Sequence, residues 1–535
     1  MTRRTPMSTP APRLRPAWII ALICLPIFIG ALDLTVVSAV LPHVIYDLEI
    51  PVQTGLDDAA WVVSGYLLAY SVAMTFMGRL SDLAGRRKTY LLALLIFALG
   101  SYLVAVADTW PTTLAMRLGA LLTHQRLDPA QVSLWTLIGA RSIQAFGGGA
   151  MVPVGMALAG DLYPPHRRAQ ALGVIAAVDT AGWVVGHLYG GILTRFFDWR
   201  LIFWLNLPVC LLAFVLIALA LRGVNTLQAP AAGKARMDWL GALLISLCLA
   251  AINLGLNSNA ETASTFEEQT SSLTGESLPF LLAAAVCFGL FLWRQRRAAF
   301  PLISLALFRR LNFTAACLAN FLMGISLFIA IANVPLFINT LIAETLEQGA
   351  WDSGWVLSAL TVPMALASIP GGWLTSRLSY RWPAITGMLL ALGGFLLMHG
   401  WTMDTPYRIM LPHLLLTGIG FGLVMAPIAA AAINAAPAEE RGTASGLVII
   451  FRLVGMTIGV SGIASYGVQR AEHLSRALVD SSTTLVEIVQ IGMQVAEQVI
   501  SETFWIAAAF AALSLVPIAI LKSNALKGAS YELPV

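Results

Sequence analysis

Residues 78–88 read Gly-Arg-Leu-Ser-Asp-Leu-Ala-Gly-Arg-Arg-Lys, a short charged stretch between two long apolar runs, residues 59–77 and 89–107. Each run is long enough to cross a bilayer as a helix, which takes ~20 apolar residues. Because the connection is so short, the two helices are expected to be antiparallel neighbours. Its basic residues predict a cytoplasmic loop, since Lys and Arg concentrate on that side of the membrane.

The composition of the whole chain supports a membrane protein. Of its 535 residues, 58% are hydrophobic and only 11% are charged, whereas soluble domains carry roughly 25% charged residues. We therefore expect an all-α polytopic protein, because lipid cannot satisfy the edges of open sheets. The net charge of +4 is spread over short loops, which argues against a nucleic-acid partner. The five cysteines lie in apolar runs without metal or disulfide spacing, and no cofactor is expected.

Fourteen apolar runs are candidate membrane spans. They are residues 17–40, 59–77, 89–107, 134–160, 169–193, 201–221, 238–257, 278–293, 313–338, 354–375, 383–402, 407–432, 443–467 and 502–521. With the N-terminus inside, the inner segments carry 23 Lys and Arg and the outer segments carry 7, while Arg141 and Arg452 lie within spans and complete the 32. This asymmetry predicts that both termini are cytoplasmic, in an inner or plasma membrane.

An internal repeat divides the chain. Residues 168–173, Arg-Ala-Gln-Ala-Leu-Gly, are echoed by residues 441–446, Arg-Gly-Thr-Ala-Ser-Gly. The expected division is a cytoplasmic tail at 1–16, an N-terminal six-helix bundle at 17–222, a linker with two extra transmembrane helices at 223–312, a C-terminal six-helix bundle at 313–521 and a cytoplasmic tail at 522–535. Parallel repeats of this kind place a substrate site between the halves, near the bilayer midplane.

Two segments exceed what short connections need. Within residues 112–130, residues 112–122 are predicted to form a short interfacial helix. Residues 469–500 carry apolar positions that fit a helix lying on the membrane surface. We expect residues 112–130 and 469–500 to serve as packing or lid elements.

Two charged residues lie inside predicted spans. Asp33 interrupts the first span, where a carboxylate is costly unless it is protonated, paired or hydrated. Arg141 lies in the fourth span and cannot lose its proton, so it needs a carboxylate or water. We expect the two to pair, and proton binding by Asp33 to compete with that pair. The alternatives are a structural hydrogen bond for Asp33 and an Arg141 that reaches the outer interface.

The loop at 78–88 offers a conformational latch. Gly78 and Gly85 permit tight backbone turns, and Asp82 can accept hydrogen bonds from a helix start or an Arg. Asp161 closes the fourth span and could pair with Arg86 or Arg87, latching one state; a solvated helix end is the alternative. The ordered pattern of Gly78, Leu80, Asp82, Gly85, Arg86 and Arg87 resembles the signature loop of the major facilitator superfamily, with Leu83 where that family usually has Arg.

The fifth span combines glycines with two titratable residues. Gly182, Gly186, Gly190 and Gly191 resemble the antiporter motif of drug-efflux branches of that family, with His187 in place of the central Pro. Asp179 lies eight residues before His187, on a similar helix face, and the two are candidates for a proton site. A histidine that only packs is the alternative.

The resemblance extends to the fourteen-span drug:proton antiporter branch. It rests on Asp33 in the first span, on residues 198–208 with their Trp-Arg and Asn-Leu-Pro elements, and on residues 238–241 and 451–455. In that branch an Asp at the position of Asp33 is linked to proton coupling. The resemblance implies a major facilitator fold of two six-helix bundles plus two additional helices.

The function expected from these features is proton-coupled export of lipophilic or cationic drugs by alternating access. The alternatives are a proton-linked or facilitative transporter of a lipid or metabolite and, in another class, a membrane sensor without transport. An enzyme is not expected, because no nucleophile, metal set or pair of facing carboxylates is evident. The expected partners are the lipid bilayer, a small-molecule substrate and protons, with a periplasmic adaptor protein as a further candidate.

Overall fold

The computed structural model describes residues 15–48, 50, 52–123, 128–222, 236–257, 277–478 and 484–522. These residues form helices and no strand. In chain order the α-helices are α1 (Pro16–Asp47), α2 (Val52–Ala84), α3 (Arg86–Ala105), α4 (Trp110–Thr123), α5 (Pro129–Leu162), α6 (Pro165–Phe196), α7 (Arg200–Ala220), α8 (Trp239–Asn257), α9 (Ser277–Arg297), α10 (Leu311–Phe337), α11 (Leu346–Arg377), α12 (Arg381–Met398), α13 (Tyr407–Ala435), α14 (Arg441–Leu478) and α15 (Leu485–Ile520).

The helix ends follow from local sequence. Gly85 separates α2 from α3 with a φ of 93°, which a residue with a Cβ rarely adopts. Asp128 accepts a hydrogen bond from the amide of Ala130 and so caps α5. Thr484 and Glu487 form a capping box at the start of α15, in which each side chain accepts the other's backbone amide.

Thirteen helices of the described part are long and apolar enough to cross a membrane, and α8 adds a shorter apolar stretch, Trp239–Ile252. These stretches correspond to the fourteen predicted spans, so the predicted all-helical membrane architecture is confirmed. The residues between Arg222 and Arg236 and between Asn257 and Ser277 lie outside the described part.

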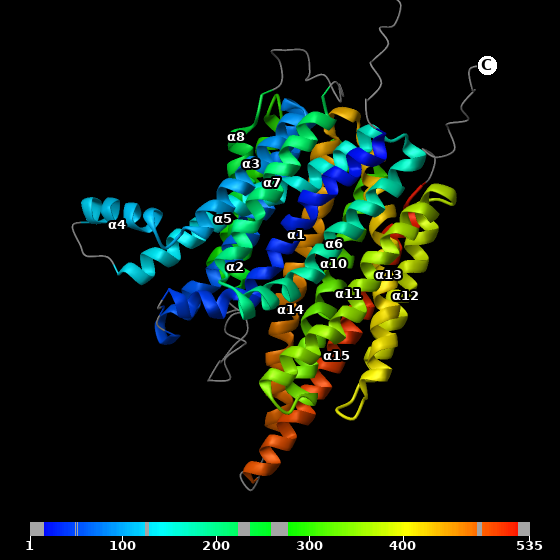
Figure 1. Cartoon of the computed structure of the whole chain (residues 1–535). Helices are drawn as coiled ribbons and strands as arrows, with labels where there is room; N and C mark the ends of the chain where they lie inside the picture. Colours follow the sequence, from blue (N-terminus) through cyan, green and yellow to red (C-terminus); the bar gives the residue numbers. More distant parts are fainter. Residues whose placement is uncertain are drawn as a thin grey trace, which may run out of the picture.

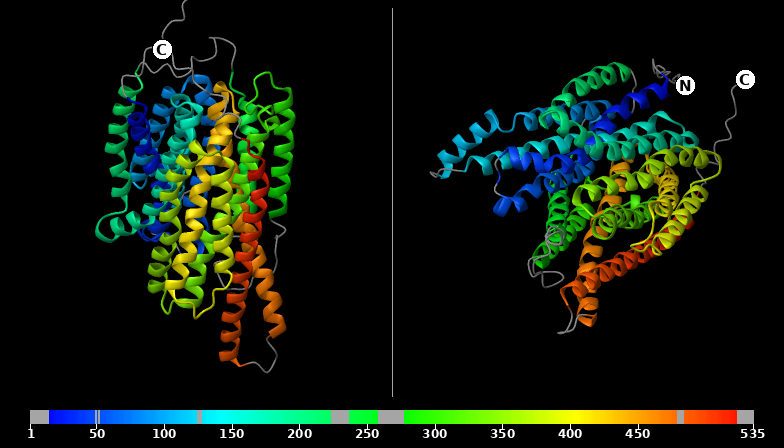
Figure 2. Two further views of the ribbon diagram at one scale, coloured as in Figure 1. Left: turned by 90° about the vertical axis from the view of Figure 1, so that its right-hand side faces the viewer. Right: turned by 60° about the horizontal axis from the view of Figure 1, so that its bottom comes forward.

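The helices form two groups (Figures 1 and 2). In the first group, α1 packs on α6, and α5 packs on α2 and α3. In the second, α13 packs on α11 and α12, and α10 packs on α14 and α15. The groups meet mainly where α6 contacts α11 and α2 contacts α14. The predicted boundaries of two bundles, as units that move against each other, stay a prediction.

The α8–α9 hairpin lies beside the junction of α2 and α14. Trp239 packs against Phe76 of α2 with 5.4 Å between ring centroids. Asp238 is buried at the start of α8 and accepts hydrogen bonds from the Gly241 amide and from Gln295 of α9. The two extra helices are therefore tied to each other and to the first group.

The segment 469–500 differs from the prediction of a helix lying on the membrane surface. Within it, residues 469–478 and 485–500 form continuous extensions of α14 and α15, which project together beyond the other helices (Figures 1 and 2). A helix of 36 residues is about 54 Å long, against a bilayer core of about 30 Å. Arg470 and Glu502 join the two helices at 2.8 Å. The prediction was wrong because no proline separates either extension from its span, and Gly467 does not interrupt α14.

The segment after α3 contains the predicted short helix, which is α4. It points sideways from the bundle (Figure 1) and exposes Leu114, Leu118, Leu121 and Leu122. These positions recur at helical spacing and make one side of α4 apolar.

Candidate functional site

Asp33 and Arg141 form a buried ion pair inside the first group of helices. Nη1 of Arg141 donates to Oδ2 of Asp33 at 2.6 Å, and Nη2 donates to the Asp33 carbonyl at 3.2 Å. The side chains are 0% and 1% exposed. The structure therefore brings together the two charges that the sequence singled out, while their role in proton coupling stays a prediction.

Polar neighbours add hydrogen bonds to this pair, while Nε of Arg141 has no partner among the described residues. Gln144 accepts from Arg141 at 2.7 Å and donates to Oδ1 of Asp33 at 3.0 Å, so it touches both charges. Ser101 and Asn206 extend this network from α3 and α7. Sequence reasoning did not assign sites to these three residues, although each is a polar residue within an apolar run. Protonation of Asp33 would weaken several of these hydrogen bonds together.

The guanidinium of Arg141 lies against an aromatic face. Its Cζ is 4.2 Å from the ring centroid of Tyr66 on α2, a cation–π distance. Tyr66 stacks on Tyr70 with 6.0 Å between centroids. Since Tyr70 lies within electrostatic reach of Asp179 and Arg452, the two tyrosines connect the buried pair with a second pair of charges.

That second pair bridges the two groups of helices. Nη2 of Arg452 on α14 is 3.7 Å from Oδ2 of Asp179 on α6. The side chains are 13% and 10% exposed, and Oδ1 of Asp179 has no hydrogen-bond partner among the described residues. Asp179 therefore faces a cation of the other group. The proposed Asp179–His187 site lies partly outside the described residues, because the side chain of His187 is not described.

The glycines of α6 allow it to pack closely on α1, beside Asp33. A Cβ on Gly182 would lie 2.6 Å from the Phe28 carbonyl oxygen, and one on Gly186 would lie 2.5 Å from that of Leu32. Thr35 donates a hydrogen bond to the Trp183 carbonyl at 3.1 Å across the same contact. Gly190 is buried further along α6, and the surroundings of Gly191 are not described.

At the Gly85 end of the molecule, Asp82 holds the start of α14. Its carboxylate accepts from the amides of Gly442 and Thr443, each at 2.8 Å, and from the Thr443 hydroxyl at 2.7 Å. A Cβ on Gly78 would lie 2.6 Å from the Gly442 carbonyl oxygen, so glycine is needed where α2 meets α14. A carboxylate at a helix N-terminus also interacts favourably with the helix dipole.

Arg86 and Asp161 complete this set, which we call the latch cluster (Asp82, Arg86, Asp161, Arg441). Arg86 donates to Asp82 at 2.5 Å and to Asp161 at 3.0 Å, and Arg441 of α14 donates to Asp161 at 2.8 Å. Arg87 does not join the cluster, because it donates to the Ala218 carbonyl at 3.0 Å. Of the two basic partners suggested for Asp161, the structure thus selects Arg86, and it adds Arg441 from the other group.

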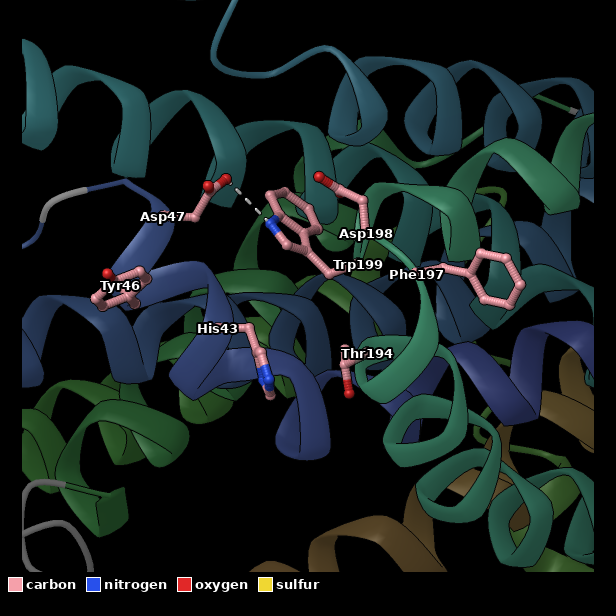
Figure 3. A pocket seen from close by; sticks show the side chains of 7 residues that line it. All are labelled: His43, Tyr46, Asp47, Thr194, Phe197, Asp198 and Trp199. Carbon is pink, nitrogen blue, oxygen red and sulfur yellow. Dashed lines mark hydrogen bonds between the residues drawn. The ribbon is translucent and has the colours of Figure 1, made fainter.

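A separate pocket of about 280 Å³ opens where α1 ends near the α6–α7 connection. Its lining residues are His43, Tyr46, Asp47, Thr194, Phe197, Asp198 and Trp199 (Figure 3). The Trp199 indole donates to Asp47 at 3.3 Å, and Arg200 bridges Asp47 and Asp108 at 2.6 and 2.7 Å. Ten residues along α1, about 15 Å, separate His43 from Asp33, so this pocket is distinct from the buried pair. Within the described ranges no group of three or more His, Cys, Asp or Glu is placed to hold a metal ion.

Comparison with protein-family models matches most of the chain. A family model described as Major Facilitator Superfamily matches residues 23–343 and, again, residues 316–530. The two matches together cover nearly the whole chain, including the buried pair, the latch cluster and the long α14 and α15.

Curated relatives align over most of their length. A triacylglyceride transporter of Mycobacteroides abscessus is 32% identical over 457 residues, which cover 83% of this chain and 81% of that protein. A triacylglyceride transporter of Mycobacterium tuberculosis is 30% identical over 485 residues, which cover 88% and 86%.

Solved structures share the fold at low sequence identity. The proton:xylose symporter XylE aligns with a TM-score of 0.57 and 14% identity, covering 93% of this chain and 95% of that one. The human organic anion transporter MFSD10 aligns with a TM-score of 0.57 and 15% identity, covering 93% and 100%. At these identities the likeness shows the fold alone.

Proposed function

The chain belongs to the Major Facilitator Superfamily, and on that premise we propose that it exports lipophilic molecules across the cytoplasmic membrane in exchange for protons. It is a multi-pass membrane transporter and not an enzyme. The substrate class, the coupling ion and the direction are the proposed parts.

The observation that carries proton coupling is the Asp33–Arg141 pair, which is closed off from solvent and joined by a 2.6 Å hydrogen bond, with Gln144 bonded to both members. Protonation of Asp33 would cancel the attraction to Arg141 and free Gln144 and Asn206 to rearrange. Because α6 packs against α1 through Gly182 and Gly186, such a rearrangement would shift α6, the helix that carries Asp179. Asp179 in turn faces Arg452 across the two groups, so the proton site and the contact between halves are linked.

The latch cluster supports alternating access. In this structure it holds α14 against α2 and α5, so the Gly85 end is closed. We place that end in the cytoplasm, because its loops carry the basic residues. The same orientation puts both termini in the cytoplasm and the α14–α15 extensions outside, where an adaptor protein would meet them.

A lipid is the substrate that the relatives favour, since proteins of 30–32% identity are named triacylglyceride transporters. The second candidate is a lipophilic or cationic drug. The specific observation behind it is the first-span Asp33 together with the glycine pattern of α6, which resemble the drug:proton antiporter branch. Both classes have large apolar parts, through which they would enter the membrane and reach a site between the halves.

The test is transport by the purified chain in lipid vesicles. A fluorescent triacylglycerol that a membrane-impermeant reagent bleaches reports movement between leaflets, and a cationic dye is followed in parallel. An imposed pH gradient is expected to drive lipid movement, and an uncoupler to abolish it. In Asp33→Asn the gradient-driven rate is expected to fall about tenfold or more, because about 1.4 kcal/mol of lost coupling already costs tenfold.

Asp47→Asn is the matched control, because Asp47 lies at the far end of α1 and its side chain is 43% exposed. It is expected to transport like the unaltered chain. Equal gradient-driven transport by Asp33→Asn would reject this residue as the proton site. Movement of the dye without movement of the lipid would reject the lipid and favour the drug.

A further inference from the structure

A second polar cluster lies at the Gly85 end, where the start of α6 meets the end of α13 and Tyr380, the residue before α12. Arg168 donates from Nη1 to Oδ1 of Asn434 at 2.6 Å and from Nε to the Tyr163 carbonyl at 2.9 Å. Asn434 donates from Nδ2 to the Tyr380 hydroxyl, also at 2.6 Å. Arg168 is 8% exposed and Tyr380 is 1% exposed. The cluster joins the two groups of helices, and the sequence reasoning assigned no site to its members.

The internal repeat relates this cluster to the latch cluster. Asn434 precedes Arg441 by seven residues, and Asp161 precedes Arg168 by the same seven. In the latch cluster, Arg441 at the start of α14 binds Asp161 at the end of α5. In the second cluster, Arg168 at the start of α6 binds Asn434 at the end of α13. The two contacts therefore join equivalent positions of the repeat. In one, the Arg belongs to the second half, and in the other, it belongs to the first half.

The remaining members follow the same correspondence. Residues 372–376, Gly-Trp-Leu-Thr-Ser, echo residues 78–82, Gly-Arg-Leu-Ser-Asp, in a second part of the repeat. Tyr380 follows Ser376 by four residues, as Arg86 follows Asp82. Ser376 donates to the Gly372 carbonyl of its own helix at 3.1 Å, whereas Asp82 holds the start of α14. Tyr380 thus replaces a cation, and Ser376 replaces an acid.

The second cluster therefore contains a buried cation and no carboxylate. The hydrogen bonds of Arg168 go to the neutral oxygens of Asn434 and Tyr163. Of the latch cluster, Arg441 repels Arg168 and Asp161 attracts it from a distance, without a hydrogen bond to it among the described contacts. Hydrogen bonds from Arg to a carboxylate are roughly twice as strong as those between neutral groups. Burial is the main influence on the Tyr380 phenol and raises its pKa, so the hydroxyl stays protonated and can donate as well as accept.

We propose that Arg168, Tyr380 and Asn434 form a second latch between the halves, weaker than the latch cluster, at which the Gly85 end begins to open. This inference rests on the proposed transport cycle. Because the two latches lie at equivalent positions and only one has carboxylates, the halves separate first along α6 and α13 and last along α2 and α14. Arg168 acts here as a positioning residue and not as a substrate ligand.

The test supplies the missing carboxylate through Asn434→Asp. Hydrogen–deuterium exchange of the full chain in lipid nanodiscs reports opening through the backbone amides of residues 163–170 and 376–384. Asn434→Asp is expected to slow this exchange about fivefold or more, as for a coupling at the low end of the usual range, and to slow transport in parallel. The Tyr380 hydroxyl can donate to the new carboxylate, so the contact within the cluster is kept.

Two further variants test whether the contacts of each latch control the exchange rate. Tyr380→Phe removes one bond to Asn434 and is expected to speed exchange in the same two segments. Asp161→Asn makes the latch cluster resemble the second latch and is expected to speed exchange at residues 438–445. Unchanged or faster exchange in folded Asn434→Asp, or no change in Tyr380→Phe, would overturn the proposal.

Measuring both exchange and transport distinguishes failure of the second latch from failure of the proposed transport function. If the variants shift exchange as expected but no lipid moves in any of them, the second latch stands and the proposed substrate fails. If the unaltered chain moves lipid with protons and the variants leave exchange unchanged, the transport function stands and the second latch fails.

Discussion

Asp33 is a charge that the surrounding residues have made tolerable in the membrane. Arg141, Gln144 and Asn206 all donate to its carboxylate, and Tyr66 covers the guanidinium of Arg141. Removing one partner of a buried ion pair typically costs about 3–5 kcal/mol. Such a site is stable only while both charges are present. Protonation of Asp33 is therefore expected to change the contacts around Arg141.

Asp179 and Arg452 offer a test of coupling between the halves. In a double-mutant cycle with Asp179→Asn and Arg452→Gln, we expect a coupling energy of about 0.5–3 kcal/mol, as for residues in contact. The readout is the thermal stability of the purified chain. Purely additive effects would contradict an energetic contact between α6 and α14.

His187 stands where the antiporter pattern has proline, and histidine is the side chain whose unperturbed pKa lies nearest neutral pH. If it titrates during transport, His187→Pro is expected to move the pH dependence of the transport rate. The rate is measured in vesicles between about pH 5 and 8, the range in which histidine changes charge. An identical pH profile would exclude a titrating role for His187.

At the scale of elements, the contact of α6 with α1 depends on the absence of side chains. In Gly186→Ala the new Cβ would overlap the Thr35 hydroxyl and the Leu32 carbonyl, so the helices must separate. Overpacking of this kind typically costs about 1–3 kcal/mol, and we expect lower thermal stability together with weaker proton-driven transport. Gly139→Ala on α5 is the control, because a Cβ at that position would meet nothing within 4 Å, and it should change neither. Equal stability of both variants would show that α6 can move away from α1 at no cost.

The α14–α15 extensions are a feature that hydropathy did not predict, namely two helices that continue beyond their apolar spans. Both helices are longer than a bilayer core requires because the chain remains helix-forming. The Arg470–Glu502 pair joins them, and the capping box at Thr484 begins α15. Apolar positions such as Ile488 and Met493 suggested a membrane-surface helix, since periodicity reports an amphipathic face without saying what covers it.

At the scale of the whole molecule, the latch cluster sets the balance between states. Arg86→Ala leaves Asp82 and Asp161 without their shared cation, so we expect the closed Gly85 end to be destabilised. The transport rate is expected to fall severalfold, with little change in the substrate concentration for half-maximal rate. Arg87→Ala is the control, because Arg87 lies in the same loop but bonds only to the Ala218 carbonyl among the described contacts. A loss of affinity at an unchanged maximal rate would contradict the latch.

The sequence by itself determined the membrane class, the helical architecture and the internal repeat, and it singled out Asp33, Arg141, Asp82, Arg86 and Asp161. It could do so because hydropathy, the rarity of charges in apolar runs and the glycine of a tight turn are local properties. Only the tertiary structure decided the partners: Arg452 for Asp179, Arg441 for Asp161, and Asn434 for Arg168. Each of these contacts joins residues more than 250 positions apart, and the choice among several available charges depends on how the helices of one half pack against those of the other.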